Sequence, residues 1–183
     1  MQLVDINKSI YRKRLNIVIA IFVACLTLIS IGLGAILIQL FGDALPAVDP
    51  KTGEALSNFR YNFVGVILAL LVCISILQQL KNHPFCKEIH YVWVLKQIQN
   101  IIYRRLKNIK AAANNYEKEP DINAFVVLNF YYKSLIQVYM LDNNTLTIST
   151  VKQNLASLEE RMTELNLDVT AHEFRRVLLI EYR

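Results

Sequence analysis

Glycine and cysteine are scarce in this chain of 183 residues, which contains five glycines and three cysteines. Phosphate-cradling loops are rich in glycine, and the sequence contains no such loop, no nucleophile elbow and no His-Glu-x-x-His helix. Three cysteines are also too few for a disulfide-stapled scaffold, and Cys25 and Cys73 fall inside apolar runs. We therefore expect no disulfide, no cofactor and no enzyme activity.

Charged residues and histidine are absent from two long runs, residues 15–41 and 61–80. A helix needs about 20 mostly apolar residues to cross the roughly 30 Å hydrocarbon layer of a bilayer, and both runs are long enough. A cleaved signal peptide has an apolar core of only about 7 to 15 residues, which argues for a retained anchor. The two runs predict two transmembrane helices.

Basic side chains are distributed unevenly along the chain. Residues 1–14 hold four basic side chains and one acidic, and residues 42–60 hold two and three. Residues 81–118 hold eight basic side chains and two acidic, and residues 119–183 hold six and nine. The positive-inside rule places both termini in the cytoplasm and the short loop outside. The predicted order is a basic cytoplasmic N-terminus, a two-helix transmembrane hairpin with a connector over 42–60, and a cytoplasmic domain.

Several basic residues lie directly beside the predicted spans. Lysine and arginine near anionic headgroups each contribute about 1 kcal/mol to membrane attraction. The basic charge of residues 81–118 is also compatible with nucleic-acid binding, but no recognisable binding motif accompanies it. We expect a lipid bilayer as partner and no nucleic acid. The candidate contacts with anionic lipid are Arg12, Lys13, Arg14, Lys81 and Lys87.

Small residues recur at four-residue spacing within both predicted spans. Such spacing lines one helix face and lets two backbones approach closely, although it also arises by chance. We expect the stripe in the second span to pack on the first span or on another copy of the chain. The candidate transmembrane packing residues are Gly65, Ala69, Cys73, Ser30 and Gly34.

Residues 81–183 show apolar residues at steps of three and four and no long strict alternation, which predicts an all-α domain of about four helices. The first predicted helix covers residues 84–116, and it is open whether it continues the second span. The second covers 121–140 and is apolar on most sides, which indicates a buried central helix. Asn123, Asn129, Lys133 and Gln137 interrupt its apolar character, which argues against a third span.

Two further helices are expected toward the C-terminus. A narrow apolar stripe from Val151 to Leu165 predicts the third helix of the domain. Thr170 and Glu173 form a capping-box pattern, which predicts a fourth helix that begins at Ala171. This last helix is expected to bury its apolar side chains Phe174, Val177 and Leu178.

The residue types that bind metals gather only once, at His83, Cys86 and His90. Cys86 and His90 lie one helical turn apart, but His83 precedes a proline and would have to fold back to complete a zinc site. We therefore expect no metal. His172 is interpreted as a residue at a helix start.

Three segments carry a resemblance to a known family: residues 11–16 (Tyr-Arg-Lys-Arg-Leu-Asn), 58–63 (Asn-Phe-Arg-Tyr-Asn-Phe) and 83–87 (His-Pro-Phe-Cys-Lys). The chain resembles a family of small bacterial inner-membrane proteins with two spans and no assigned function. The resemblance covers the whole length, implies a multi-pass protein of a bacterial inner membrane, and carries over no functional residues.

Three functional hypotheses follow. The first is a non-enzymatic, membrane-anchored interaction or scaffold module that meets a protein partner or copies of itself, with no small-molecule substrate. The second is a subunit of an oligomeric membrane pore or transport complex, although the predicted spans contain no ionisable residue of the kind that ion paths use. The third is an enzyme acting next to the membrane, which would need a concave polar site gathering residues such as Glu117, Glu119, His90 and Tyr131.

Overall fold

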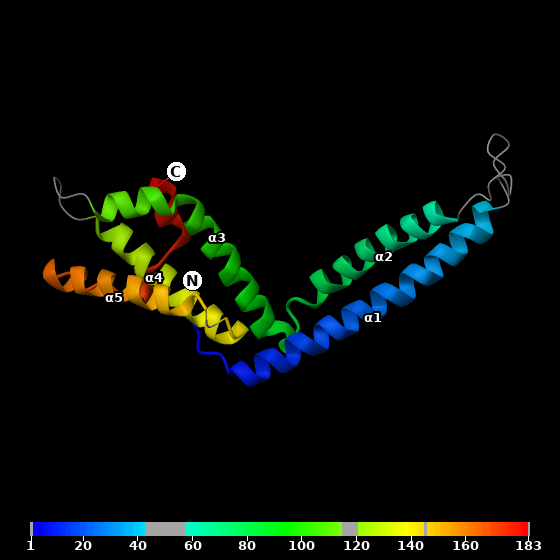
Figure 1. Ribbon diagram of the computed structural model, residues 1–183, viewed down its shortest axis with the longest axis horizontal. Coiled ribbons are helices and arrows are strands. Elements are labelled where there is room, and N and C mark those ends of the chain that lie inside the picture. Colours follow the sequence, from blue (N-terminus) through cyan, green and yellow to red (C-terminus); the bar gives the residue numbers. More distant parts are fainter. Residues whose placement is uncertain (1, 43–57, 115–120, 145, 183) are drawn as a thin grey trace. The chain divides into compact units, whose positions relative to one another are not determined.

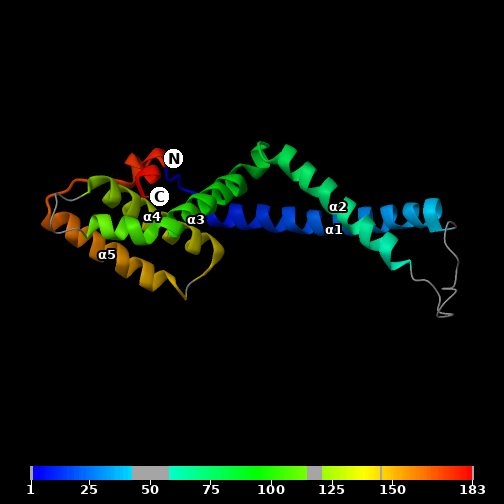
Figure 2. The same ribbon diagram turned by 90° about the horizontal axis from the view of Figure 1, so that it is seen from above.

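The computed structural model describes residues 2–42, 58–114, 121–144 and 146–182, and these contain helices and no strand. The expectation of an all-α protein is therefore confirmed over the described residues. Most of the predicted connector and two of the candidate acidic residues, Glu117 and Glu119, lie outside this part. The helices are α1 (Lys8–Phe41), α2 (Phe59–Leu80), α3 (Lys87–Ala113), α4 (Ile122–Asp142) and α5 (Ile148–Glu164), with short 3-10 helices η2 (Pro84–Cys86), η3 (Ala171–Glu173) and η4 (Arg176–Tyr182) (Figures 1 and 2).

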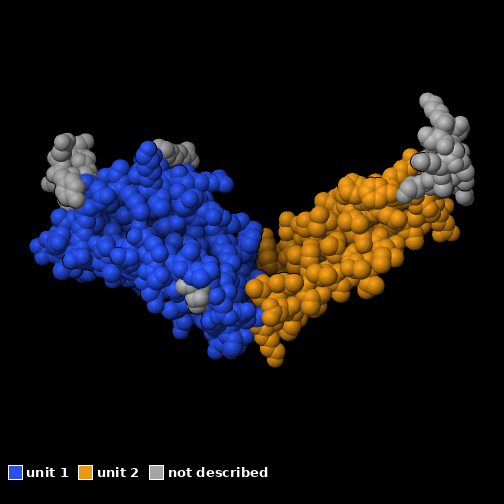
Figure 3. Space-filling view, in the orientation of Figure 1, with its two compact units in different colours: residues 1–12, 88–183 blue, residues 13–87 orange. Residues whose placement is uncertain are grey.

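The chain forms two compact units, shown in different colours in Figure 3. Unit 1 consists of residues 1–12 and 88–183, and unit 2 consists of residues 13–87. Unit 1 thus contains both the start of the chain and its last half. The residues of unit 2 lie between these two parts in the sequence. Residues 2–12 are called the N-terminal arm below.

Unit 2 contains most of α1 together with α2, and the two helices run antiparallel. At one end of the pair, the Tyr61 hydroxyl donates a hydrogen bond of 2.8 Å to the Phe41 carbonyl oxygen. Toward the opposite end, the Arg14 guanidinium lies 5.4 Å from the centre of the Phe85 ring. The first contact joins the end of α1 to the start of α2. The second joins an early turn of α1 to the residues that follow α2.

The residues between α2 and α3 interrupt the helix, so α3 does not continue α2. His83 has an extended backbone, and its Nδ1 atom accepts a 3.2 Å hydrogen bond from the Phe85 nitrogen. Pro84 then opens the 3-10 helix η2, in the first-turn position where its missing N–H costs nothing. The long helix predicted over 84–116 is therefore shorter, because α3 begins at Lys87 and ends at Ala113.

Helix α4 is enclosed on nearly all sides by the rest of unit 1. Twelve of its residues are buried, and it contacts α5, η3 and η4. Both ends are capped: the Asp121 side chain accepts a hydrogen bond from the Ala124 nitrogen, and Asn143 adopts the left-handed conformation that ends helices. The predicted buried central helix agrees with this burial. The apolar stripe of α5 also points inward, since Val151, Leu158 and Met162 are buried.

The C-terminal segment differs from the predicted fourth helix. The Thr170 nitrogen does donate a 2.9 Å hydrogen bond to Glu173 Oε1, as the capping pattern predicts, and this bond helps lower the pKa of Glu173. However, the segment forms the 3-10 helices η3 and η4 with a break between them, so unit 1 has three α-helices among its described residues. A 3-10 helix has three residues per turn, which brings a different set of side chains inward.

The period of three residues per turn decides which side chains of the C-terminal segment are buried. Phe174 is buried as expected, but Val177 is 59% exposed and Leu178 is only half-buried. Leu179 and Tyr182 are buried in their place. The Phe174 ring stacks on the Phe130 ring of α4, with centroids 4.0 Å apart. The Tyr182 hydroxyl donates a 2.8 Å hydrogen bond to Asp121, which caps the same helix.

This arrangement predicts unequal costs for two truncations in the C-terminal segment. Phe174→Ala should destabilise unit 1 by about 3 to 5 kcal/mol, because it removes a buried ring and leaves a cavity against Phe130. Val177→Ala should change the stability by less than about 0.5 kcal/mol, because the side chain is exposed. Denaturant unfolding of the full chain in mild detergent measures both. Equal losses would support the α-helical register predicted from the sequence instead.

Candidate functional site

Four polar side chains interrupt the apolar surface of α4, and each has a partner on a different part of unit 1. Asn123 donates to Glu181 of η4 at 3.3 Å, and Asn129 donates to the Val169 carbonyl oxygen at 3.3 Å. Lys133 forms a 3.3 Å ion pair with Glu159 of α5. Gln137 donates to the Val4 carbonyl oxygen in the N-terminal arm. Asn129 is the buried member of this set, and a buried polar group is costly without a partner. The other three contacts lie nearer the surface and join α4 to η4, α5 and the arm.

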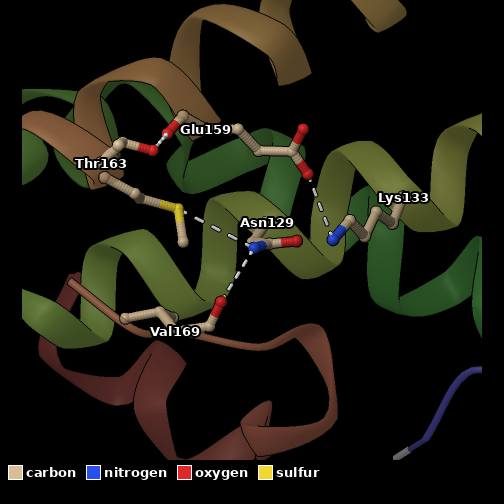
Figure 4. Close-up of polar contacts among 6 residues, drawn as sticks. Asn129, Lys133, Glu159, Thr163 and Val169 are labelled. Atoms are coloured by element: carbon tan, nitrogen blue, oxygen red, sulfur yellow. Dashed lines mark hydrogen bonds and ion pairs between the residues drawn. The ribbon is translucent and has the colours of Figure 1, made fainter. Parts of the chain in front are cut away.

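The contacts around Asn129 show how α4, α5 and the segment before η3 are joined (Figure 4). Asn129 is 1% exposed, and its Nδ2 atom also lies 3.8 Å from the Met162 sulfur. Its Oδ1 atom has no hydrogen-bond partner among the described residues. On the adjacent turn of α5, the Thr163 hydroxyl donates to the Glu159 carbonyl oxygen at 2.9 Å. This cluster holds helices together and presents no reactive group to solvent.

Three hydroxyl side chains in α1 and α2 are satisfied differently, by the backbone of their own helix. The Thr27 hydroxyl donates to the Val23 carbonyl oxygen at 2.9 Å, and the Ser75 hydroxyl donates to the Leu71 carbonyl oxygen at 2.8 Å. Ser30 bonds to its own helix in the same way, to the carbonyl oxygen three residues earlier. Such groups need no partner from another element, so they are compatible with an apolar solvent around the helix.

Among the described residues, three helices, α1, α2 and α4, are long and apolar enough to cross a membrane. They differ in how much of their apolar surface the protein itself covers. Within the most apolar 18-residue window, 6% of the residues are buried in α1, 17% in α2 and 67% in α4. The surfaces of α1 and α2 carry exposed leucine, isoleucine, valine and phenylalanine side chains along their length. Two helices therefore leave their apolar faces uncovered, whereas the third is covered by protein.

The small residues predicted to mediate helix packing lie at the contact between α1 and α2. Gly65, Ala69 and Cys73 are buried residues of α2. A Cβ atom added at Gly65 would lie 2.8 Å from the Gly34 nitrogen and 3.1 Å from the Ser30 carbonyl oxygen. The two backbones therefore approach too closely at this point to accommodate any larger residue without a shift.

The N-terminal arm is attached to α3 and α4 by its backbone and by one aromatic side chain. The Val4 nitrogen donates a 2.9 Å hydrogen bond to the Tyr91 hydroxyl, which itself donates to Gln137 at 3.2 Å. Burial raises the pKa of Tyr91, so its hydroxyl keeps the proton that it donates. Tyr11 is buried and hydrogen-bonded to Asp142 at the end of α4. Asp142 also forms a 2.7 Å ion pair with Lys96 of α3.

Sequence reasoning missed this attachment, since it assigned the first 14 residues only a basic charge. The contacts depend on Val4 backbone atoms, which have no sequence signature. One signal was present: Tyr11 is an aromatic residue placed directly before three basic side chains. In the structure Tyr11 is buried, whereas Lys13, two residues later, is exposed.

The five predicted lipid-contact residues are not alike in their surroundings. Lys13, Lys81 and Lys87 are exposed. Arg12 is half-buried, and its Nη1 atom is enclosed without a hydrogen-bond partner among the described residues. Arg14 is also half-buried and lies over the Phe85 ring. The three lysines are thus the members of the set most accessible to an external partner.

The described residues contain no group of three or more histidine, cysteine, aspartate or glutamate side chains placed to hold a metal ion. His83 instead caps η2, and His90 stacks against Trp93 with ring centroids 5.8 Å apart. His172 lies exposed within η3. His83 and His90 therefore have local structural contacts, and Cys86 is a half-buried free cysteine.

A family model described as a protein of unknown function, DUF3087, matches residues 1–179. The chain belongs to this family. No curated protein and no solved structure matches it. The expected resemblance to an uncharacterised family is confirmed. The matched region includes the arm, both exposed apolar helices and unit 1 up to residue 179.

The close approach of α1 and α2 predicts different effects for two glycine substitutions. Gly65→Ala should lower the stability of the full chain in mild detergent by about 1 to 3 kcal/mol, because its methyl group meets the α1 backbone. Gly32→Ala is the matched control, since a Cβ atom there meets nothing within 4 Å. Both variants gain the same helix propensity, so their difference in thermal unfolding isolates the packing term. Indistinguishable midpoints would show that this contact does not support the unit.

Proposed function

We propose that this chain is an integral membrane protein whose α1 and α2 cross a bacterial inner membrane. The observation that carries the proposal is the difference in burial among its apolar helices, because α1 and α2 leave their apolar faces uncovered and α4 does not. An exposed apolar helix of this length is costly in water and stable in lipid. The self-bonded hydroxyls of α1 and α2 also fit an environment without water.

The N-terminal arm supports a topology with both ends on one side of the membrane. Val4 precedes α1, Tyr91 follows α2, and the two residues are hydrogen-bonded. Residues in direct contact lie on the same side of a membrane, so the chain between them crosses an even number of times. Two crossings, by α1 and α2, satisfy this condition. The excess of basic residues in 1–14 and 81–118 favours the cytoplasm as that side.

We further propose that unit 1 acts as a non-enzymatic interaction or scaffold module held at the cytoplasmic membrane surface, where it binds a protein partner or another copy of the chain. Its buried polar side chains support this role, because they connect helices to one another. Gln99 of α3, for example, donates to Ser134 of α4 at 3.1 Å in the core. Side chains used in this way stabilise a binding surface and are not available for chemistry.

Cysteine labelling tests the anchor and the topology. In a background with the three native cysteines replaced by alanine, single cysteines are introduced as Gln2→Cys, Ser57→Cys and Ser149→Cys. A membrane-impermeant maleimide should label only the cysteine at 57 in spheroplasts, and only those at 2 and 149 in inverted vesicles. Labelling of 2 and 149 from opposite faces, or recovery of the chain in the soluble fraction without detergent, would overturn the proposal.

Photo-crosslinking in intact membranes tests the interaction module. A photoreactive phenylalanine analogue at Ile180, an exposed residue of η4, should yield a discrete crosslinked species with another protein or a second copy. The same analogue at Phe174, which is 1% exposed, is the control and should crosslink only within the chain. If several exposed positions across unit 1 crosslink nothing but lipid, the scaffold role is wrong while the membrane anchor stands.

A further inference from the structure

Helix α3 carries charge of one sign over nearly its whole length. After Glu88 it contains no acidic residue to its end at Ala113, but it contains five basic ones. Two of these are used inside unit 1: Lys96 pairs with Asp142, and Arg105 donates to the Leu179 carbonyl oxygen. The other three are exposed, and they are Arg104, Lys107 and Lys110.

Part of this charge lies on the same helix face as a large exposed aromatic residue. Trp93, Gln97, Asn100, Arg104 and Lys107 follow one another at steps of four, three, four and three, which places them on one side of α3. All five are exposed, and Trp93 is 55% exposed. This set is called the outer face of α3. Tyr103, which is 67% exposed, lies on its flank.

We propose that the outer face of α3 binds the anionic headgroup surface of the bilayer. The inference rests on the proposed function, because it requires α2 to be a membrane span. A tryptophan beside arginine and lysine side chains suits the membrane interface, where indole rings sit at the level of the headgroups and basic groups meet lipid phosphates. An exposed tryptophan in contact only with water would gain neither interaction.

The chain itself limits how far α3 lies from the membrane. Helix α2 ends at Leu80 and α3 begins at Lys87, so few residues separate them. At about 3.5 Å per extended residue, seven steps span no more than roughly 25 Å. Trp93 is in the second turn of α3, about 9 Å further along the helix axis. The outer face therefore begins within reach of the bilayer that contains α2.

The sequence provides a direct probe, because Trp93 is the only tryptophan in the chain. The full chain is reconstituted into nanodiscs of phosphatidylcholine alone or with about one third phosphatidylglycerol. In the anionic discs, Trp93 emission should shift to the blue, be quenched by lipids brominated near the headgroup, and be protected from aqueous acrylamide. High salt should reverse these changes, because it screens the attraction.

The variant Arg104→Gln/Lys107→Gln tests the basic side chains. Removing both charges should weaken the association of this face with the membrane about 25-fold, at about fivefold for each charge, and return bromolipid quenching to its level in zwitterionic discs. Lys152→Gln, on the exposed side of α5, removes a basic charge elsewhere in unit 1 and should leave quenching unchanged.

Three results would overturn the inference. The first is a water-exposed Trp93 with no bromolipid quenching in either lipid composition. The second is a blue shift of Trp93 emission that appears only when an RNA oligonucleotide is added, which would indicate nucleic acid as the ligand. The third is a blue shift that depends on the number of protein copies per disc, which would indicate contact with another copy of the chain. If the chain enters the discs and Trp93 behaves in one of these ways, only this inference fails. If the chain does not enter the discs, the proposed function itself fails.

Discussion

The enclosure of α4 is the constraint on which unit 1 depends. This helix is apolar around nearly its whole circumference, so it is stable only where something other than water surrounds it. The polar side chains that interrupt its apolar surface decide what that surrounding is. Asn129 at its centre reaches the Val169 carbonyl oxygen, and Gln137 near its end reaches the arm. Lipid offers no such partners, and leaving these groups unpaired in hydrocarbon costs several kcal/mol each. Protein therefore covers α4, and α5, the C-terminal segment and the arm are held in place by covering it.

The same criterion separates α4 from α1 and α2, which resemble it in length and composition. Hydropathy alone places all three helices among those able to cross a membrane. What differs is where the polar groups find partners. Thr27 and Ser75 bond to carbonyl oxygens of their own helix, so they make no demand on neighbouring elements. The location of the partner thus distinguishes α4, whose polar side chains bond to other elements, from α1 and α2, whose hydroxyls bond within their own helix.

Much of the architecture is encoded locally and was predictable. The uncharged runs, the inward stripe of α5 and the hydrogen bond from Thr170 to Glu173 all depend on residues a few positions apart. Contacts between distant residues were not predictable: Gln137 and Val4 are separated by 133 positions, and one partner is a backbone atom. The C-terminal segment failed for another reason. Its start signal was correct, but a cap does not specify whether 3.0 or 3.6 residues complete a turn, and that period decides whether Val177 or Leu179 is buried.

The arm matters for the topology that we propose. Val4 and Tyr11 belong to unit 1 through their contacts with Tyr91 and Asp142, so the segment 13–87 leaves unit 1 and returns to it. Under the proposed topology, two spans that begin and end at one folded unit cannot slide independently through a membrane. The family match over residues 1–179 includes every part of this closed arrangement. A tether that only concentrates a soluble domain at a surface needs one span and a flexible linker, so the return of the chain to unit 1 fits the proposed two-span anchor better than a simple tether.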